Sequence, residues 1–128
     1  MLDAMAKALD AGAEAVRFRP SGNSMMPRIR HKELVTVYQI PDKTRLRPGD
    51  IVLAKVRGVT RLHQILAVDH PNNRVETGNM RRHSDGYVAY HAIHGIRLTV
   101  EQASACAERE SARNAQEAAR ATLADARA

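Results

Sequence analysis

Short runs of β-forming residues, separated by turn residues, cover most of this sequence. Five such runs are predicted strands: residues 16–19, 34–38, 51–56, 59–68 and 74–77. Val, Ile, Thr and Tyr fit a pleated surface, whereas Gly, Pro, Asp and Asn interrupt it. The pattern therefore predicts a mainly β domain built from antiparallel strands.

Turn signals indicate how these strands connect. Pro48-Gly49-Asp50 introduces one buried strand, and Arg57-Gly58 predicts a tight hairpin from that strand into the next. Residues 78–86 are polar, and we expect a loop there. Residues 87–100 predict one or two closing strands, interrupted near Gly95.

Both ends of the chain have helical patterns instead. Residues 2–14 repeat apolar residues at helical spacing, and Gly12 is placed to end that helix. From Glu101 onward alanine, glutamate and arginine dominate, which favours helix, with Leu123 nearly alone as a large apolar residue. We therefore expect three parts: a short N-terminal helix (1–15), a β domain (16–100) and an Ala-rich, helical or partly disordered tail (101–128). The terminal helices are candidate contacts for a homo-oligomer.

Length and composition fit one small domain, because the chain has 128 residues, of which 44% are hydrophobic. The single cysteine, Cys106, excludes an internal disulfide and an all-cysteine metal site. The sequence shows no secretory leader and no apolar run of roughly 18 to 20 residues. We therefore expect a cytoplasmic protein without a membrane anchor.

Positive charge is concentrated in the middle of the chain. Residues 16–98 hold 15 Lys and Arg against 6 Asp and Glu, a net charge of +9, whereas the chain as a whole has +6. Such a field suits a nucleic acid or an acidic protein as partner. Aromatic residues for base stacking are scarce and no helix-turn-helix or zinc-finger pattern is present, so a solvated basic surface is the alternative.

The stretch Pro20-Ser21-Gly22-Asn23-Ser24-Met25-Met26-Pro27 contains the main candidate chemistry. Flexible residues precede Ser24, and those after it can begin a short helical turn whose free N–H groups stabilise an oxyanion. A serine so placed is a nucleophile if a base reaches it. His63 is a candidate base, because a neutral imidazole can take the serine proton and return it to a leaving amine. The alternative is a loop serine and an unrelated strand histidine.

The order of these motifs resembles that of the LexA/UmuD-like and signal-peptidase superfamily of serine peptidases. The resemblance spans about residues 17–98 and lies in Gly22-Asn23-Ser24-Met25-Met26-Pro27, then Pro48-Gly49-Asp50-Ile51-Val52-Leu53-Ala54-Lys55-Val56, then Thr60-Arg61-Leu62-His63. It implies a coiled antiparallel sheet of the LexA and signal-peptidase type. It also implies a serine endopeptidase that cleaves a peptide bond in a protein or peptide substrate and needs no cofactor or metal ion.

The resemblance assigns roles to individual residues. Bacterial members usually have a lysine base, but eukaryotic and archaeal signal peptidases have histidine at the position of His63, which implies a Ser24/His63 dyad. Lys55 is the alternative base, but it lies in the preceding strand and does not match the motif. The resemblance further implies an oxyanion hole from the N–H groups of Asn23 and Ser24. Asp85 falls where histidine-type enzymes carry an acidic residue that orients the base; a turn aspartate before a glycine is the alternative.

Some features depart from the superfamily and leave the substrate open. His31-Lys32-Glu33 replaces the usual Gly-Asp turn, and the chain shows neither the DNA-binding domain of the repressors nor the membrane helix of the secretory enzymes. It is similar instead to compact, stand-alone members from phages and prophages. The rival hypothesis is a catalytically silent β scaffold that binds a protein or nucleic-acid partner through its basic face. The remaining histidines suggest no metal site.

Overall fold

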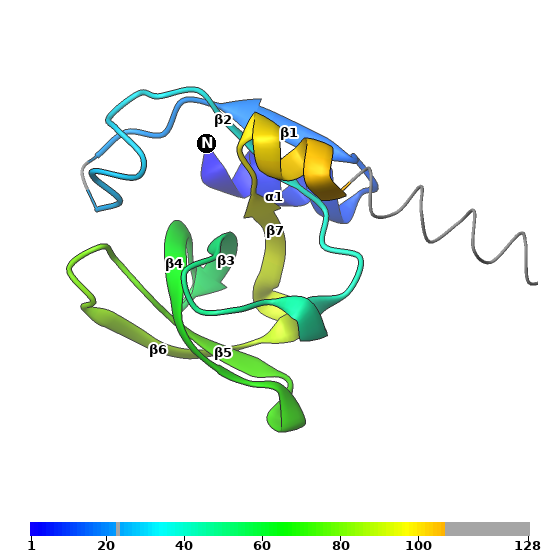
Figure 1. Ribbon diagram of the computed structural model, residues 1–128, viewed down its shortest axis with the longest axis vertical. Coiled ribbons are helices and arrows are strands. Elements are labelled where there is room, and N and C mark those ends of the chain that lie inside the picture. The colour runs from blue at the N-terminus through cyan, green and yellow to red at the C-terminus, as the bar shows by residue number, and fades with distance from the viewer. Residues whose placement is uncertain (23, 107–128) are drawn as a thin grey trace, which may run out of the picture. The chain divides into compact units, whose positions relative to one another are not determined.

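The computed structural model describes residues 1–22 and 24–106, which fall into two compact units, residues 1–98 and the chain from Thr99 onward. The described part of the first unit is a seven-stranded antiparallel sheet with one α-helix (Figure 1). Its elements are α1 (Leu2–Asp10), β1 (Ala15–Phe18), β2 (Val35–Tyr38), β3 (Ile51–Val56), β4 (Val59–Asp69), β5 (Arg74–Gly78), β6 (Ser84–Ala89) and β7 (Ile93–Arg97). The mainly β class and the short N-terminal helix predicted from the sequence are confirmed.

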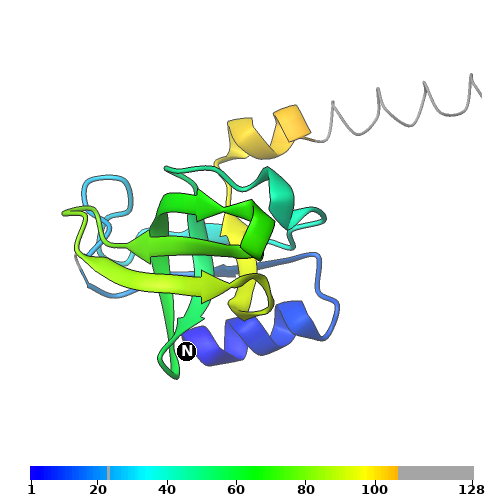
Figure 2. The same ribbon diagram turned by 90° about the horizontal axis from the view of Figure 1, so that it is seen from below.

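The strands follow the spatial order β1-β2-β7-β3-β4-β5-β6. Central strand β3 is buried on both faces, because Ile51 and Leu53 belong to one hydrophobic cluster and Val52 and Ala54 to a second. Alternate side chains of a strand point to opposite faces, so each cluster covers one face of β3. Helix α1 covers the first cluster, packing against β1, β3, β4 and β7, and runs along one flank of the sheet in Figure 2.

Gly95 of β7 permits the close approach of α1 and β2. A Cβ atom at this position would lie 2.6 Å from Val37 Cγ1 and 2.9 Å from Leu9 Cδ1. Strand β7 continues through Gly95, but its pairing with β3 shifts by one residue there, because Leu53 pairs with Gly95 and Ala54 with Ile93. The interruption expected around Gly95 is therefore a bulge within the strand rather than a break between two strands. The break lies earlier, at a 3₁₀ turn formed by Tyr90–Ala92.

The hairpin between β3 and β4 agrees with the sequence pattern. Arg57 and Gly58 have φ values of +49° and +81°, the left-handed pair that two-residue hairpins with primed turns need. The expected loop over residues 78–86 is partly wrong, because β6 already begins at Ser84. Pairing with β5 draws Ser84, Asp85 and Gly86 into the sheet despite their low β propensity.

The second unit is described only as far as residue 106. Residues 100–106 are helical, and Thr99 forms a capping box with Gln102. The Gln102 N–H donates to Thr99 Oγ1 over 3.1 Å, and the Thr99 N–H donates to Gln102 Oε1 over 2.9 Å. The rest of the predicted tail, including Leu123, lies outside the described residues. Across residues 1–22 and 24–106, no helix is long and apolar enough to cross a membrane.

Candidate active site

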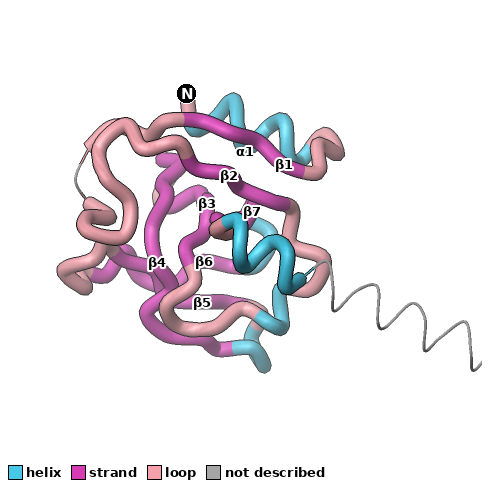
Figure 3. Tube along the Cα trace, turned by 45° about the horizontal axis from the view of Figure 1, so that its top comes forward, coloured by secondary structure: helices cyan, strands magenta, loops and turns pink. Residues whose placement is uncertain are grey.

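Ser24 lies in the long loop that connects β1 and β2 (Figure 3). The loop makes one helical turn, in which the Ile29 N–H donates to the Met25 carbonyl over 2.9 Å. Met25 and Ile29 are buried in the first hydrophobic cluster, whereas Ser24 is exposed. Burial of these two apolar residues therefore anchors the loop and leaves the serine at the surface.

Three further hydrogen bonds hold the Ser24 loop in place. The Lys32 N–H donates to the Pro20 carbonyl over 2.7 Å and closes the base of the loop. The Gly22 N–H donates to His31 Nδ1 over 2.9 Å, so His31 ties the start of the loop to its end. The carbonyl of Ser24 accepts from the Met80 N–H over 2.9 Å, so the loop is tied to the turn between β5 and β6.

His63 is carried by β4, directly opposite Val52 of β3. The Pro48-Gly49-Asp50 turn holds this part of β4, since Gly49 donates to and Asp50 accepts from the backbone of Ile65, both over 2.8 Å. Val52 and His63 are paired, so their side chains share one face of the sheet. Lys55 lies three residues after Val52, so its side chain points to the face opposite that of His63. It is exposed and does not line the cleft described below. His63 therefore has the better position for a base.

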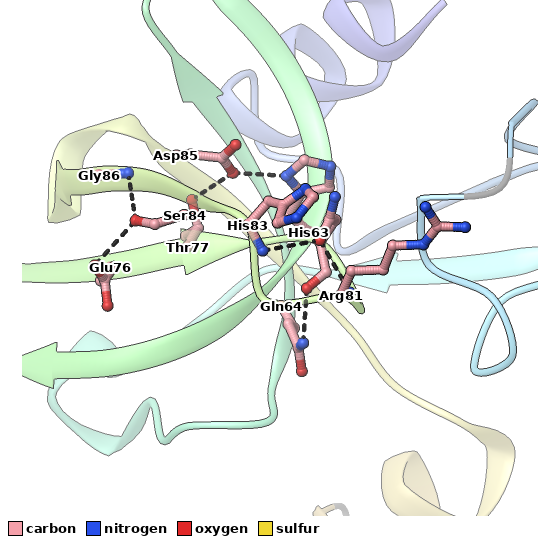
Figure 4. Close-up of polar contacts among 10 residues, drawn as sticks. His63, Gln64, Glu76, Thr77, Arg81, His83, Ser84, Asp85 and Gly86 are labelled. Atoms are coloured by element: carbon pink, nitrogen blue, oxygen red, sulfur yellow. Dashed lines mark hydrogen bonds and ion pairs between the residues drawn. The ribbon is translucent and has the colours of Figure 1, made fainter.

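Asp85 lies against His63, as Figure 4 shows. The distance between His63 Nδ1 and Asp85 Oδ2 is 2.6 Å, and the Thr77 hydroxyl donates to the same oxygen over 3.0 Å. The two side chains are only 10% and 15% exposed, so the contact is formed largely out of water, where hydrogen bonds between polar groups are stronger. Asp85 is thus a strand residue that contacts His63, and the interpretation as a turn aspartate is wrong.

A β-bulge explains how Asp85 reaches the histidine. Thr77 pairs with Gly86 and Gly78 pairs with Ser84, so Asp85 is the extra residue between two paired positions. Bulges commonly redirect a side chain in this way. Gly78 has no room for a side chain, because a Cβ atom there would lie 2.6 Å from the His83 carbonyl oxygen. The bulge, the tight glycine and Thr77 together fix the Asp85 carboxylate.

The contact with Asp85 also settles which nitrogen of His63 is available. A carboxylate only accepts hydrogen bonds, so in the neutral imidazole Nδ1 carries the proton and Nε2 has a free lone pair. Within the described residues, Nε2 has no hydrogen-bond partner in the protein. Every buried side-chain nitrogen or oxygen of these residues does have a partner, so Nε2 is not a buried atom. Nε2 therefore reaches solvent, as the basic nitrogen of a proton acceptor must.

Ser24 and His63 line the same cleft, which has a volume of about 180 Å³. Its walls are formed by Leu2, Pro20, Ser21, Gly22, Ser24, Met25, Ile29, Arg30, Val59, Thr60, Arg61, Leu62 and His63. In the described part of the chain, no hydrogen bond joins the Ser24 hydroxyl to the His63 ring. Asn23, the other residue expected in the oxyanion hole, lies outside the described residues.

One edge of the cleft is a strand without a neighbour. Residues 59–63 of β4 pair with β3 on one side, but β5 pairs with β4 only from Gln64 onward. No other described strand covers this edge of residues 59–63. Their outward N–H and carbonyl groups can therefore pair with an extended peptide, which adds a strand to the sheet.

Helix α1 is fastened to this strand beside the cleft. The Thr60 hydroxyl donates a short hydrogen bond to Asp3, and this bond holds the pKa of the Asp3 carboxyl below its ordinary value. The contact places Leu2 at the cleft wall. The contacts of Thr60, Thr77 and Met80 have no local signature in the sequence, because Thr60 and Met80 bond to residues far away in the chain and Thr77 meets Asp85 only across paired strands.

No family model, curated protein or solved structure matches this chain. In the described residues, no group of three or more His, Cys, Asp or Glu side chains is arranged to hold a metal ion. The geometry of the cleft therefore carries the functional argument.

Proposed function

We propose that this protein is a serine endopeptidase in which Ser24 is the nucleophile, His63 the general base and Asp85 the residue that orients the base. The observation that carries the proposal is the 2.6 Å contact between His63 Nδ1 and Asp85 Oδ2, at the wall of a cleft that Ser24 also lines. A base oriented by a carboxylate and open to a shared cleft is the arrangement that serine hydrolases use on unrelated folds.

The chemistry follows from the free nitrogen of His63. Nε2 takes the proton of the Ser24 hydroxyl as its oxygen attacks the substrate carbonyl, and Asp85 stabilises the imidazolium that forms. The imidazolium then gives this proton to the leaving amine, and an ester with Ser24 remains. Water releases the acyl group by the same two proton transfers. The N–H groups at Asn23 and Ser24 are the oxyanion donors that the resemblance implies.

The substrate is an extended segment of a protein or peptide. The free edge of residues 59–63 provides backbone partners for such a segment, next to His63. Substrate seated there draws the Ser24 hydroxyl to Nε2, because catalytic hydrogen bonds that are long in a free enzyme tighten in the substrate complex.

The order of the elements supports a place in the LexA and signal-peptidase superfamily. An exposed serine loop, a Gly-Asp turn, a hairpin and the proposed base on its second strand follow one another in an antiparallel sheet. A compact cytoplasmic member of the phage or prophage type fits this composition. The catalytically silent scaffold is the alternative, and it retains the same fold without cleavage.

Cleavage of a peptide library by matched variants tests the proposal. The wild type should cut a proteome-derived library, and Ser24→Ala and His63→Ala should each lower the rate by about 10²–10⁴-fold or more. Lys55→Ala is the control and should cut at the wild-type rate. Circular dichroism verifies that all variants are folded. Equal cleavage by Ser24→Ala, or loss of cleavage in Lys55→Ala alone, would contradict the assignment, and no cleavage by any form would favour the scaffold.

A further inference from the structure

Two arginines with unpaired guanidinium groups line the cleft. Arg30 follows the Ser24 turn, Arg61 lies on β4, and both side chains are exposed. Within the described residues, neither guanidinium has a hydrogen bond or an ion pair. No Asp or Glu is among the residues that form the cleft walls. The cleft therefore brings two positive charges together without an anion from the described chain to neutralise them.

Nearby carboxylates are already engaged. Asp3 accepts the hydrogen bond of the Thr60 hydroxyl, and Asp85 accepts from His63 and Thr77. Two like charges in one cleft repel each other, so an anionic group that enters gains from both. A guanidinium is also suited to bind a carboxylate through two parallel hydrogen bonds.

We infer that the cleft selects acidic peptide segments, with Arg30 and Arg61 as the residues that determine this specificity. The inference rests on the proposed peptidase function and adds the chemical class of its substrate. Arg61 shares a face of β4 with His63 and lies two residues away, about 7 Å along the strand. An acidic side chain near the scissile bond of an extended substrate is therefore within reach of Arg61.

The rest of the cleft favours a peptide over a nucleic acid. Leu2, Met25, Val59 and Leu62 give it apolar walls, and no aromatic residue is among those that line it. Proteins that hold single-stranded nucleic acids stack the bases on aromatic side chains. The preferred occupant is thus a segment in which an acidic residue has apolar neighbours.

Binding to the full-length Ser24→Ala protein tests the specificity without depending on catalysis. Fluorescent ten-residue peptides of apolar composition, with Glu fixed at each position in turn, are compared with the matched Gln peptides. We expect the best Glu peptide to bind about threefold to tenfold tighter than its Gln partner. Arg30→Gln and Arg61→Gln, added to this protein, should each reduce that ratio, as should about 0.5 M salt, because exposed charges are screened. Arg17→Gln, an exposed arginine of β1 away from the cleft, is the control.

The outcomes separate this inference from the proposed function. Equal binding of Glu and Gln peptides overturns the acidic preference, even if the wild type cleaves both. A Glu preference that depends on Arg30 and Arg61 sustains it, even if the wild type cleaves neither and the peptidase proposal fails. A Glu preference that survives both substitutions overturns the role of the two arginines. Tighter binding of a single-stranded DNA oligonucleotide than of every Glu peptide overturns the choice of a peptide.

Discussion

A change of charge alone at Asp85 tests whether this residue orients His63. Asp85→Asn keeps the size of the side chain but removes the carboxylate that accepts from His63 Nδ1. An amide can donate to Nδ1 instead, which puts the ring proton on Nε2 and leaves no base facing Ser24. We expect the cleavage rate to fall about 10²-fold or more without loss of folding. Glu76→Gln, the same change on neighbouring β5, should leave the rate unchanged.

Initial cleavage rates of the wild type and of Asp85→Asn, measured between pH 5 and 9, complete this comparison. In the wild type the rate should fall toward acid pH, because only a neutral imidazole accepts the serine proton. A wild-type rate that rises only above about pH 8 would indicate a lysine base. An Asp85→Asn rate equal to that of the wild type at all pH values would show that Asp85 has no part in orienting His63.

Sequence reasoning at the residue scale reached Ser24 and His63 through the motif order, but it could not show that Asp85 meets His63. That contact depends on a one-residue bulge between β5 and β6, and on burial of both side chains. Neither has a local signature. The sequence could not show that Arg30 and Arg61 line one cleft either, since only the fold brings this loop residue and this strand residue together.

At the scale of elements, the packing of α1 against the sheet depends on Gly95. Gly95→Ala would force a methyl group against Val37, Tyr38 and Leu9, so we expect the free energy of unfolding to fall by about 1–3 kcal/mol. Denaturant unfolding measures this change, and Ala4→Ser on the exposed side of α1 should alter it by less than about 0.5 kcal/mol. Unchanged stability of Gly95→Ala would mean that α1 does not pack this closely on β2 and β7.

Strong local signals made the elements before residue 78 predictable. Arg57-Gly58 has the turn chemistry of a two-residue hairpin, and the strands on both sides of it lie close to the expected residues. Ser84-Asp85-Gly86 has no such signal, because its strand conformation comes from pairing with β5 rather than from its own residues. The expectation at Gly95 rested likewise on the residue type alone. A glycine suggests an interrupted strand, but here Gly95 permits close packing inside a strand.

At the scale of the whole molecule, every residue to which we assign a role in catalysis or substrate binding lies in the first unit, between Leu2 and Asp85. A chain that ends at Leu98 should therefore keep the thermal midpoint of the full-length protein within about 2 °C, and its cleavage rate within about twofold. Differential scanning calorimetry and the library assay measure both. A large loss of either would show that the chain from Thr99 onward is part of the functional fold.

The claim that Ser24 is a nucleophile activated by His63 is tested most directly by covalent labelling. The wild type, His63→Ala and Ser24→Ala are incubated with a fluorophosphonate, which forms a stable bond with activated serines, and the labelled residue is mapped by mass spectrometry. We predict one adduct on Ser24 in the wild type, formed at least about 10²-fold more slowly in His63→Ala and absent from Ser24→Ala. A folded wild type that is not labelled at Ser24, or is labelled there as fast in His63→Ala, would contradict the claim.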